Sequence, residues 1–68
     1  MLVYSFSYLL DGETLYTAKH EFADDLDALD IAERLSLDFE IEIHQGERYV
    51  ARVNKGRLLS NVHDARPG

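Results

Sequence analysis

Five carboxylates lie within ten residues of one another: Asp24, Asp25, Asp27, Asp30 and Glu33. Acidic side chains at such spacing can bind calcium, but this stretch lacks the mid-loop glycine and the final bidentate glutamate of an EF-hand. A row of carboxylates also matches the phosphates of a nucleic acid in charge, and it attracts proteins with basic surfaces. We therefore predict that these residues, together with Leu26 among them, form a partner-binding acidic face.

The chain lacks the residue sets on which most catalytic mechanisms depend. It contains no cysteine, which excludes thiol nucleophiles, disulfides and thiolate metal sites. No serine stands in a strained, glycine-flanked turn of the kind that activates a nucleophile; the serines are Ser5, Ser7, Ser36 and Ser60. Both glycine-rich phosphate-binding motifs are absent. We expect a protein that has no catalytic residues and no cofactor, and that is not an enzyme.

The histidines give only a weak indication of a metal site. Glu42 and His44 fall on the same side of an expected strand, whereas His20 and His63 lie elsewhere in the sequence. A metal site needs several clustered ligands. We therefore expect no metal site, and we interpret His44 as a loop residue and His20 as a residue at the margin of a sheet.

The acidic residues are concentrated in the first two thirds of the chain. Residues 1–47 contain twelve acidic residues against Lys19 and Arg34, whereas residues 48–68 contain five basic residues against Asp64. The net charge of −6 opposes direct binding to nucleic acid, which depends on Lys and Arg side chains that neutralise phosphates. The charge favours a protein partner with a basic surface; the alternative is that it serves only to keep the protein in solution.

The length of 68 residues limits both the domain organisation and the core. A chain of this size forms one domain, which we expect to span 1–63, followed by a flexible tail at 64–68. Such a domain buries only about 60% of the surface of its unfolded chain, so self-association or docking is an expected source of stability. No segment has the roughly 18 apolar residues of a membrane span and no basic leader precedes the first strand, so we expect a cytoplasmic protein.

Hydrophobic periodicity predicts four strands, one helix and a short fifth strand. Apolar residues recur at the two-residue period of a β-strand over 2–9, 13–22, 38–43 and 47–53, and a short strand follows Gly56. Over 24–36 they follow the period of an α-helix, with Asp24 as the N-cap. The fold class is therefore α+β: an antiparallel sheet, in the order β-β-α-β-β with a short fifth strand, covered on one face by a single helix.

The loops that end in Gly12, Gly46 and Gly56 determine the predicted registers. A two-residue Asp11-Gly12 turn would divide the aromatic residues of the first hairpin between two faces, whereas a three-residue loop keeps them on one face. We therefore predict three-residue loops. The resulting pairs are Phe6 with Tyr16, Tyr4 with Ala18, Ile41 with Tyr49, Phe39 with Ala51, Glu42 with Arg48, Asp38 with Arg52, and Leu59 with Ala51.

The expected helix has one apolar face and one acidic face. Its core-facing residues are Ala28, Leu29, Ile31, Ala32 and Leu35. Leu26 falls on the acidic side and has two interpretations. It either folds back onto the strand ends, as a first-turn leucine can, or it is a contact residue ringed by Asp27, Asp30 and Glu33.

The sheet face away from the helix is predicted to be more apolar than a face in water requires. It would carry Val3, Leu9, Leu15, Val50, Leu58 and Val62 among polar residues. An exposed apolar surface is typical of an interface between chains, so these residues form a candidate dimer face. The alternative is that they are apolar residues scattered singly over the surface.

A series of turn and core motifs runs through residues 4–53. The motifs are Tyr4-Ser5-Phe6, Leu10-Asp11-Gly12, Glu21-Phe22-Ala23-Asp24-Asp25, Asp27-Ala28-Leu29, Ala32, Glu40-Ile41-Glu42-Ile43, Gly46-Glu47-Arg48 and Val50-Ala51-Arg52-Val53. This series resembles short proteobacterial and prophage proteins of unknown function. The resemblance implies the fold, a bacterial or prophage origin and a cytoplasmic location, but no activity. Residues 54–68 extend beyond the usual end of the pattern.

The size, the acidity, the lack of cysteine and the sheet with one helix are also similar to those of phage anti-CRISPR proteins. Many proteins of that class resemble nucleic acid in charge and occupy basic channels of CRISPR effector complexes. The resemblance implies a phage-linked inhibitor that acts by nucleic-acid mimicry. We therefore predict a non-enzymatic protein-binding module that presents its acidic face to a basic nucleic-acid-handling complex. The alternative is a small, self-associating bacterial housekeeping domain, active as a homodimer.

Overall fold

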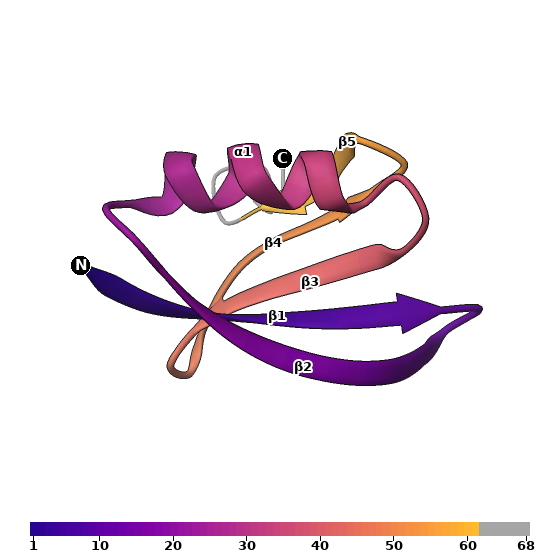
Figure 1. Ribbon diagram of the computed structural model, residues 1–68, viewed down its shortest axis with the longest axis horizontal. Coiled ribbons are helices and arrows are strands. Elements are labelled where there is room, and N and C mark those ends of the chain that lie inside the picture. The colour runs from indigo at the N-terminus through magenta and orange to yellow at the C-terminus, as the bar shows by residue number, and fades with distance from the viewer. Residues whose placement is uncertain (62–68) are drawn as a thin grey trace, which may run out of the picture.

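Six elements follow one another along the chain in the computed structural model, which describes residues 1–61 (Figure 1). Their bounds are β1 Leu2–Leu10, β2 Glu13–Phe22, α1 Asp25–Leu35, β3 Glu40–Gln45, β4 Arg48–Asn54 and β5 Arg57–Asn61. The predicted tail at 64–68 and the last two residues of the predicted domain lie outside the described residues. No helix in the described part of the chain is both long and apolar enough to cross a membrane.

The five strands form one antiparallel sheet in the order β2-β1-β3-β4-β5. The chain leaves the sheet at the edge strand β2, forms α1 over one face, and returns at the central strand β3 (Figure 1). The predicted α+β class, with one helix on an antiparallel sheet, is therefore confirmed. The order places β2 and β5 at the two edges, which matters below because edge strands carry unpaired backbone groups.

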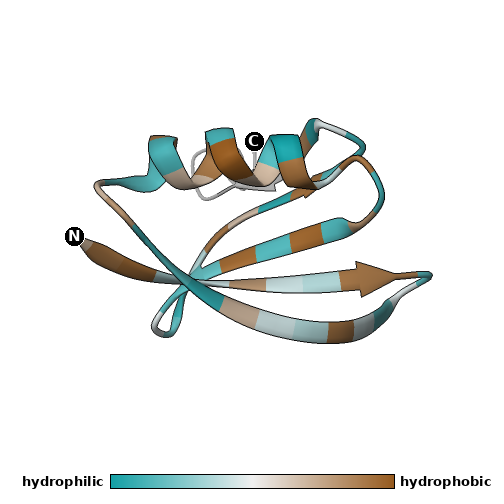
Figure 2. Ribbon diagram, viewed as in Figure 1, coloured by the Kyte–Doolittle hydropathy of each residue, from teal (hydrophilic) through white to brown (hydrophobic). Residues whose placement is uncertain are grey.

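The core lies between α1 and the central strands. Every second residue of β1 and β3 points toward the helix, and Figure 2 shows the resulting alternation of apolar and polar residues along β3. The apolar side chains that are 0% exposed are Tyr4, Phe6, Ala28, Ala32, Ile41, Ile43, Ala51 and Val53. Ala28 and Ala32 lie one helical turn apart on the same face of α1, and their small side chains let the helix lie close to the sheet.

The three hairpins share one arrangement of turn length and bulge position, which differs from the predicted one. In each, a two-residue turn is followed by two cross-strand pairs, after which one residue of the second strand bulges out of register. The turns are Asp11-Gly12, Gly46-Glu47 and Lys55-Gly56, and the bulged residues are Leu15, Val50 and Leu59. Both residues of the first and third turns have positive φ, as a type I′ turn requires. The predicted three-residue loops are therefore wrong.

The first bulge shows why the predicted pairs fail although the predicted face is correct. Phe6 lies opposite Ala18, and Tyr8, not Phe6, lies opposite Tyr16. The extra residue, Leu15, reverses the alternation of β2 once. The aromatic side chains consequently share one face in spite of the two-residue turn, and the rings of Tyr8 and Tyr16 stack with their centroids 4.6 Å apart.

The pairs predicted for the other two hairpins are wrong for the same reason. Glu42 lies opposite Arg52 instead of Arg48, and Ile41 lies opposite Val53 instead of Tyr49. Ala51, which was predicted to face Phe39 and Leu59, pairs with Ile43 and Asn61. In the β3–β4 hairpin the turn lies later than predicted and Val50 bulges, so each residue of β3 pairs with a residue further along β4 than predicted.

Helix α1 begins and ends close to the predicted positions. Asp24 is the N-cap, as predicted, because the backbone N–H of Asp27 donates to its Oδ1 at 3.0 Å. Ala28 and Ala32 are buried, and Leu29 and Ile31 pack against the core. Leu35, which was predicted to face the core, is 43% exposed, because the helix ends there and the chain turns away at the C-cap Ser36.

Candidate functional site

The acidic residues of α1 were predicted as one surface, but the fold uses some of them for itself. The carboxylate of Asp24 caps the helix and accepts from the backbone of Asp27. A cap of this kind stabilises a protein by about 1 kcal/mol. Asp24 remains exposed, so its charge contributes to the surface while its oxygen holds the first turn.

Asp25 joins the helix to two strands. Its carboxylate accepts a hydrogen bond of 2.6 Å from the hydroxyl of Tyr4 and bonds of 2.9 and 3.1 Å from the guanidinium of Arg48. Burial, followed by the hydrogen bond to Asp25, raises the pKa of Tyr4 to about 12. The charge of Asp25 is therefore matched by Arg48, and its main role is to fix the start of α1 on β1 and β4.

Asp30 makes a surface ion pair with Arg34 one helical turn later. The Arg34 Nη2 and Asp30 Oδ2 atoms are 3.3 Å apart, and the two side chains are 72% and 59% exposed. Pairs this exposed contribute between about 0 and 1 kcal/mol to stability. Asp30 can therefore exchange Arg34 for a cation of a partner at little cost.

Leu26 points into water from the first turn of α1. It is 74% exposed, so the interpretation in which it folds back onto the strand ends is wrong. At 100° per residue, Leu26 lies in one stripe with Asp30 and Glu33, and Asp27 lies beside them. Asp27 is exposed and Glu33 is partly exposed. An apolar side chain among carboxylates is the arrangement that the contact-residue interpretation predicts.

The candidate dimer face is not assembled as predicted. Val50 is 2% exposed and belongs to the core, because the β4 bulge turns it inward beside Ala51. Leu58 pairs with the buried Val53, so it lies on the helix side of the sheet, and the prediction is wrong for both residues. Val3 is 47% exposed, Leu9 is partly exposed and Leu15 is a bulged residue that is 50% exposed. Val62 lies outside the described residues.

Polar and charged groups occupy the middle of the sheet face away from the helix. Arg52 lies between two carboxylates, with its Nε 2.9 Å from Glu40 Oε2 and its Nη2 2.9 Å from Glu42 Oε2. Ser7 and Thr17 share a hydrogen bond of 3.1 Å between their hydroxyls. This face therefore has the cross-strand polar pairs of a surface in water in its described part.

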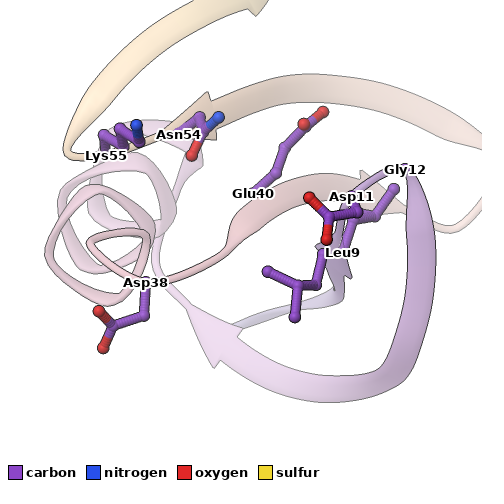
Figure 3. Close-up of a pocket in the computed structure, with 8 residues that line it drawn as sticks. Leu9, Asp11, Gly12, Asp38, Glu40, Asn54 and Lys55 are labelled. Atoms are coloured by element: carbon purple, nitrogen blue, oxygen red, sulfur yellow. The ribbon is translucent and has the colours of Figure 1, made fainter.

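A cavity of about 310 Å³ opens at the end of the sheet where the β1–β2 and β4–β5 turns meet the loop before β3. It is lined by Leu9, Leu10, Asp11, Gly12, Asp38, Glu40, Asn54 and Lys55 (Figure 3). The carboxylate of Asp38 points away from those of Asp11 and Glu40 (Figure 3), and Glu40 is bound to Arg52. Within residues 1–61, no three His, Cys, Asp or Glu side chains are grouped so that they could hold a metal ion.

The site that remains is the helix stripe, which we call the acidic helix face: Leu26, Asp27, Asp30 and Glu33. Arg48 is the structural residue that the sequence did not reveal, because it meets Asp25 only after the chain has folded, 23 residues apart. No protein-family model, curated protein or solved structure matches this chain.

Proposed function

We propose that this protein is a non-enzymatic protein-binding module whose acidic helix face docks on a basic surface of a nucleic-acid-handling protein. The observation that carries the proposal is the position of Leu26, which is 74% exposed in a stripe with Asp30 and Glu33. An apolar anchor surrounded by groups that exclude water is the usual layout of a binding hot spot. Leu26 belongs neither to the core nor to the partly buried apolar residues that pack against it.

The charges around Leu26 support a basic partner. The side chain of Asp27 is exposed and that of Glu33 is partly exposed. The ion pair between Asp30 and Arg34 is also exposed. Complementary charge accelerates association and selects partners. A row of carboxylates along a helix also matches the charge of a nucleic-acid backbone, which supports the narrower proposal of a phage-linked inhibitor that occupies a nucleic-acid channel.

The proposal is tested by capture from a bacterial lysate on immobilised protein, followed by mass spectrometry. The test variant is D27N/D30N/E33Q, which removes three charges from the acidic helix face. The matched control is D11N/E13Q/E47Q, which removes three charges from exposed residues of the hairpins. The proposal expects a basic nucleic-acid-handling protein to be captured by the wild type and the control and lost with the test variant.

Two further results decide the nature of the partner. Single-stranded and double-stranded oligonucleotides should compete with the captured complex if the face occupies a nucleic-acid channel, and raised salt should weaken the complex. Equal capture by all three proteins would contradict the acidic helix face as the site. Capture of a partner that oligonucleotides do not displace would contradict the nucleic-acid mimicry.

A further inference from the structure

Strand β2 is a long edge strand whose outer side is free of any other strand within residues 1–61. It has 10 residues and pairs only with β1 in that part of the chain. Most of its residues are exposed, including Leu15 and Tyr16 at 50% and 57%. An unpaired edge of this length is a template for another strand.

We propose that two copies of this chain pair through β2, antiparallel and centred on His20, to form one continuous sheet. A second copy fits this edge because β2 carries the complementary residues itself. A two-fold axis through His20 sets Lys19 of each copy opposite Glu21 of the other. Both residues are exposed, so neither is needed for the core.

The bulge at Leu15 limits the registers that are available. Beyond it, β2 pairs regularly with β1 from Tyr16 to Phe22, and only this regular part can continue a ladder into a second copy. Symmetric pairing over at least five of these residues can be centred on Ala18, Lys19 or His20.

Charge selects among the three registers. Centring on Lys19 sets the two lysines directly opposite each other, and like charges at opposed positions are destabilising. Centring on Ala18 sets Lys19 opposite Thr17 and leaves both charges unmatched. Centring on His20 produces two Lys19–Glu21 pairs. A lysine on an edge strand usually opposes pairing, but Glu21 two residues away makes this lysine specific for one register.

The helix-side face of β2 supports the same register. It sets Ala18 opposite Phe22, a small residue against a large one, and His20 opposite His20. Opposed residues of an antiparallel ladder have their Cβ atoms about 4.5–5.5 Å apart, so these helix-side residues of the two copies lie within packing distance of each other.

The acidic helix face stays free in this arrangement. A two-fold axis perpendicular to the sheet leaves both helices on the same side of it, and α1 packs more against β4 than against the edge strand β2. The proposed dimer therefore does not depend on the proposed function and presents two copies of the acidic helix face in one direction.

Sedimentation equilibrium of the full chain, with K19E, E21K and a 1:1 mixture of these two variants, tests the proposal. Each variant alone sets like charges opposite each other at both pairs, so its dimer should be at least about tenfold weaker than that of the wild type. In the mixture, the K19E strand has a carboxylate at both positions and the E21K strand has an ammonium group at both, so a heterodimer of wild-type strength should form. The double variant K19E/E21K should also dimerise, and K55E, at a turn remote from β2, should behave as the wild type.

Three results would overturn the proposal. The first is a wild type that stays monomeric at several hundred micromolar. The second is a K19E or E21K protein that dimerises as strongly as the wild type. The third is a mixture that stays monomeric although both variants are folded by circular dichroism. Because the mixture regains the dimer without restoring either sequence, its success cannot be ascribed to altered folding.

Discussion

The hydroxyl of Tyr4 donates a hydrogen bond of 2.6 Å to Oδ1 of Asp25, which lies 21 residues later in the chain. Tyr4 is 0% exposed and comes from β1, Asp25 opens α1, and the same carboxylate binds Arg48 at the start of β4. One carboxylate thus fixes the helix on the sheet at its N-terminal end. The acidic helix face owes its orientation to this junction, because Leu26 follows Asp25 directly.

Tyr4→Phe should destabilise the fold without removing the ion pair between Asp25 and Arg48. A hydrogen bond to a charged group contributes about 1.5–3 kcal/mol, so we expect a loss of that size in the free energy of unfolding, measured with urea. Tyr16→Phe is the matched control, because Tyr16 is 57% exposed, and its change should stay below about 0.5 kcal/mol. Equal effects of the two variants would contradict the role given to the Tyr4 hydroxyl.

Alkaline pH should weaken the fold through the same residue. The pKa of Tyr4 is raised from 10.0 to about 12 in the folded protein, so the folded state retains the proton that the unfolded state loses. This contribution to stability is complete below pH 10 and disappears as the pH rises through about 12. The stability difference between the wild type and Tyr4→Phe should therefore narrow between pH 10 and pH 12. A difference that stays constant over this range would show that the Tyr4 proton is not held by the fold.

Ser36→Ala should loosen the other end of the helix. Ser36 is 0% exposed; its Oγ donates to the Glu33 carbonyl at 3.0 Å and accepts from the Gly56 N–H at 2.9 Å. Without the hydroxyl the N–H of Gly56 loses its acceptor, which costs about 1–3 kcal/mol. Ser7→Ala removes an exposed hydroxyl bond and should cost less than about 0.5 kcal/mol. Thermal unfolding should therefore show a larger loss of stability for Ser36→Ala than for Ser7→Ala.

Val50→Ala and Val3→Ala distinguish the core from the surface among residues that were predicted to share one face. Val50 is 2% exposed, and Val3 is 47% exposed. Truncation of Val50 should cost about 2 kcal/mol of unfolding free energy through lost burial and a cavity, whereas truncation of Val3 should cost less than about 0.5 kcal/mol. If Val50→Ala were neutral, the inward position of the bulged residue would be wrong.

The elements of this fold follow from local patterns, but the registers do not. Alternation predicts the strands, and the Asp24 cap and helical period predict α1. The hairpins differ because a bulge of one residue lets a two-residue turn coexist with a common aromatic face. The Asp11-Gly12 dipeptide favours a type I′ turn, but the bulge at Leu15 leaves no separate mark in the sequence.

The candidate site shows the same division between local and long-range information. Leu26 is visible as a misfit in the helical pattern, and the exposed stripe follows from the 100° spacing. The role of Asp25 is hidden, since it depends on Tyr4 and Arg48, which belong to different strands. Likewise, Val50 fits an alternating outer face in the sequence and enters the core only through the bulge.

The most direct test of the proposed function is Leu26→Ala, measured for stability and for partner capture in parallel. Because Leu26 is 74% exposed, its truncation should change the free energy of unfolding by less than about 0.5 kcal/mol. If it is the anchor of the acidic helix face, the affinity for the captured partner should fall by at least about tenfold. Undiminished capture by a Leu26→Ala protein of full stability would contradict the proposed function.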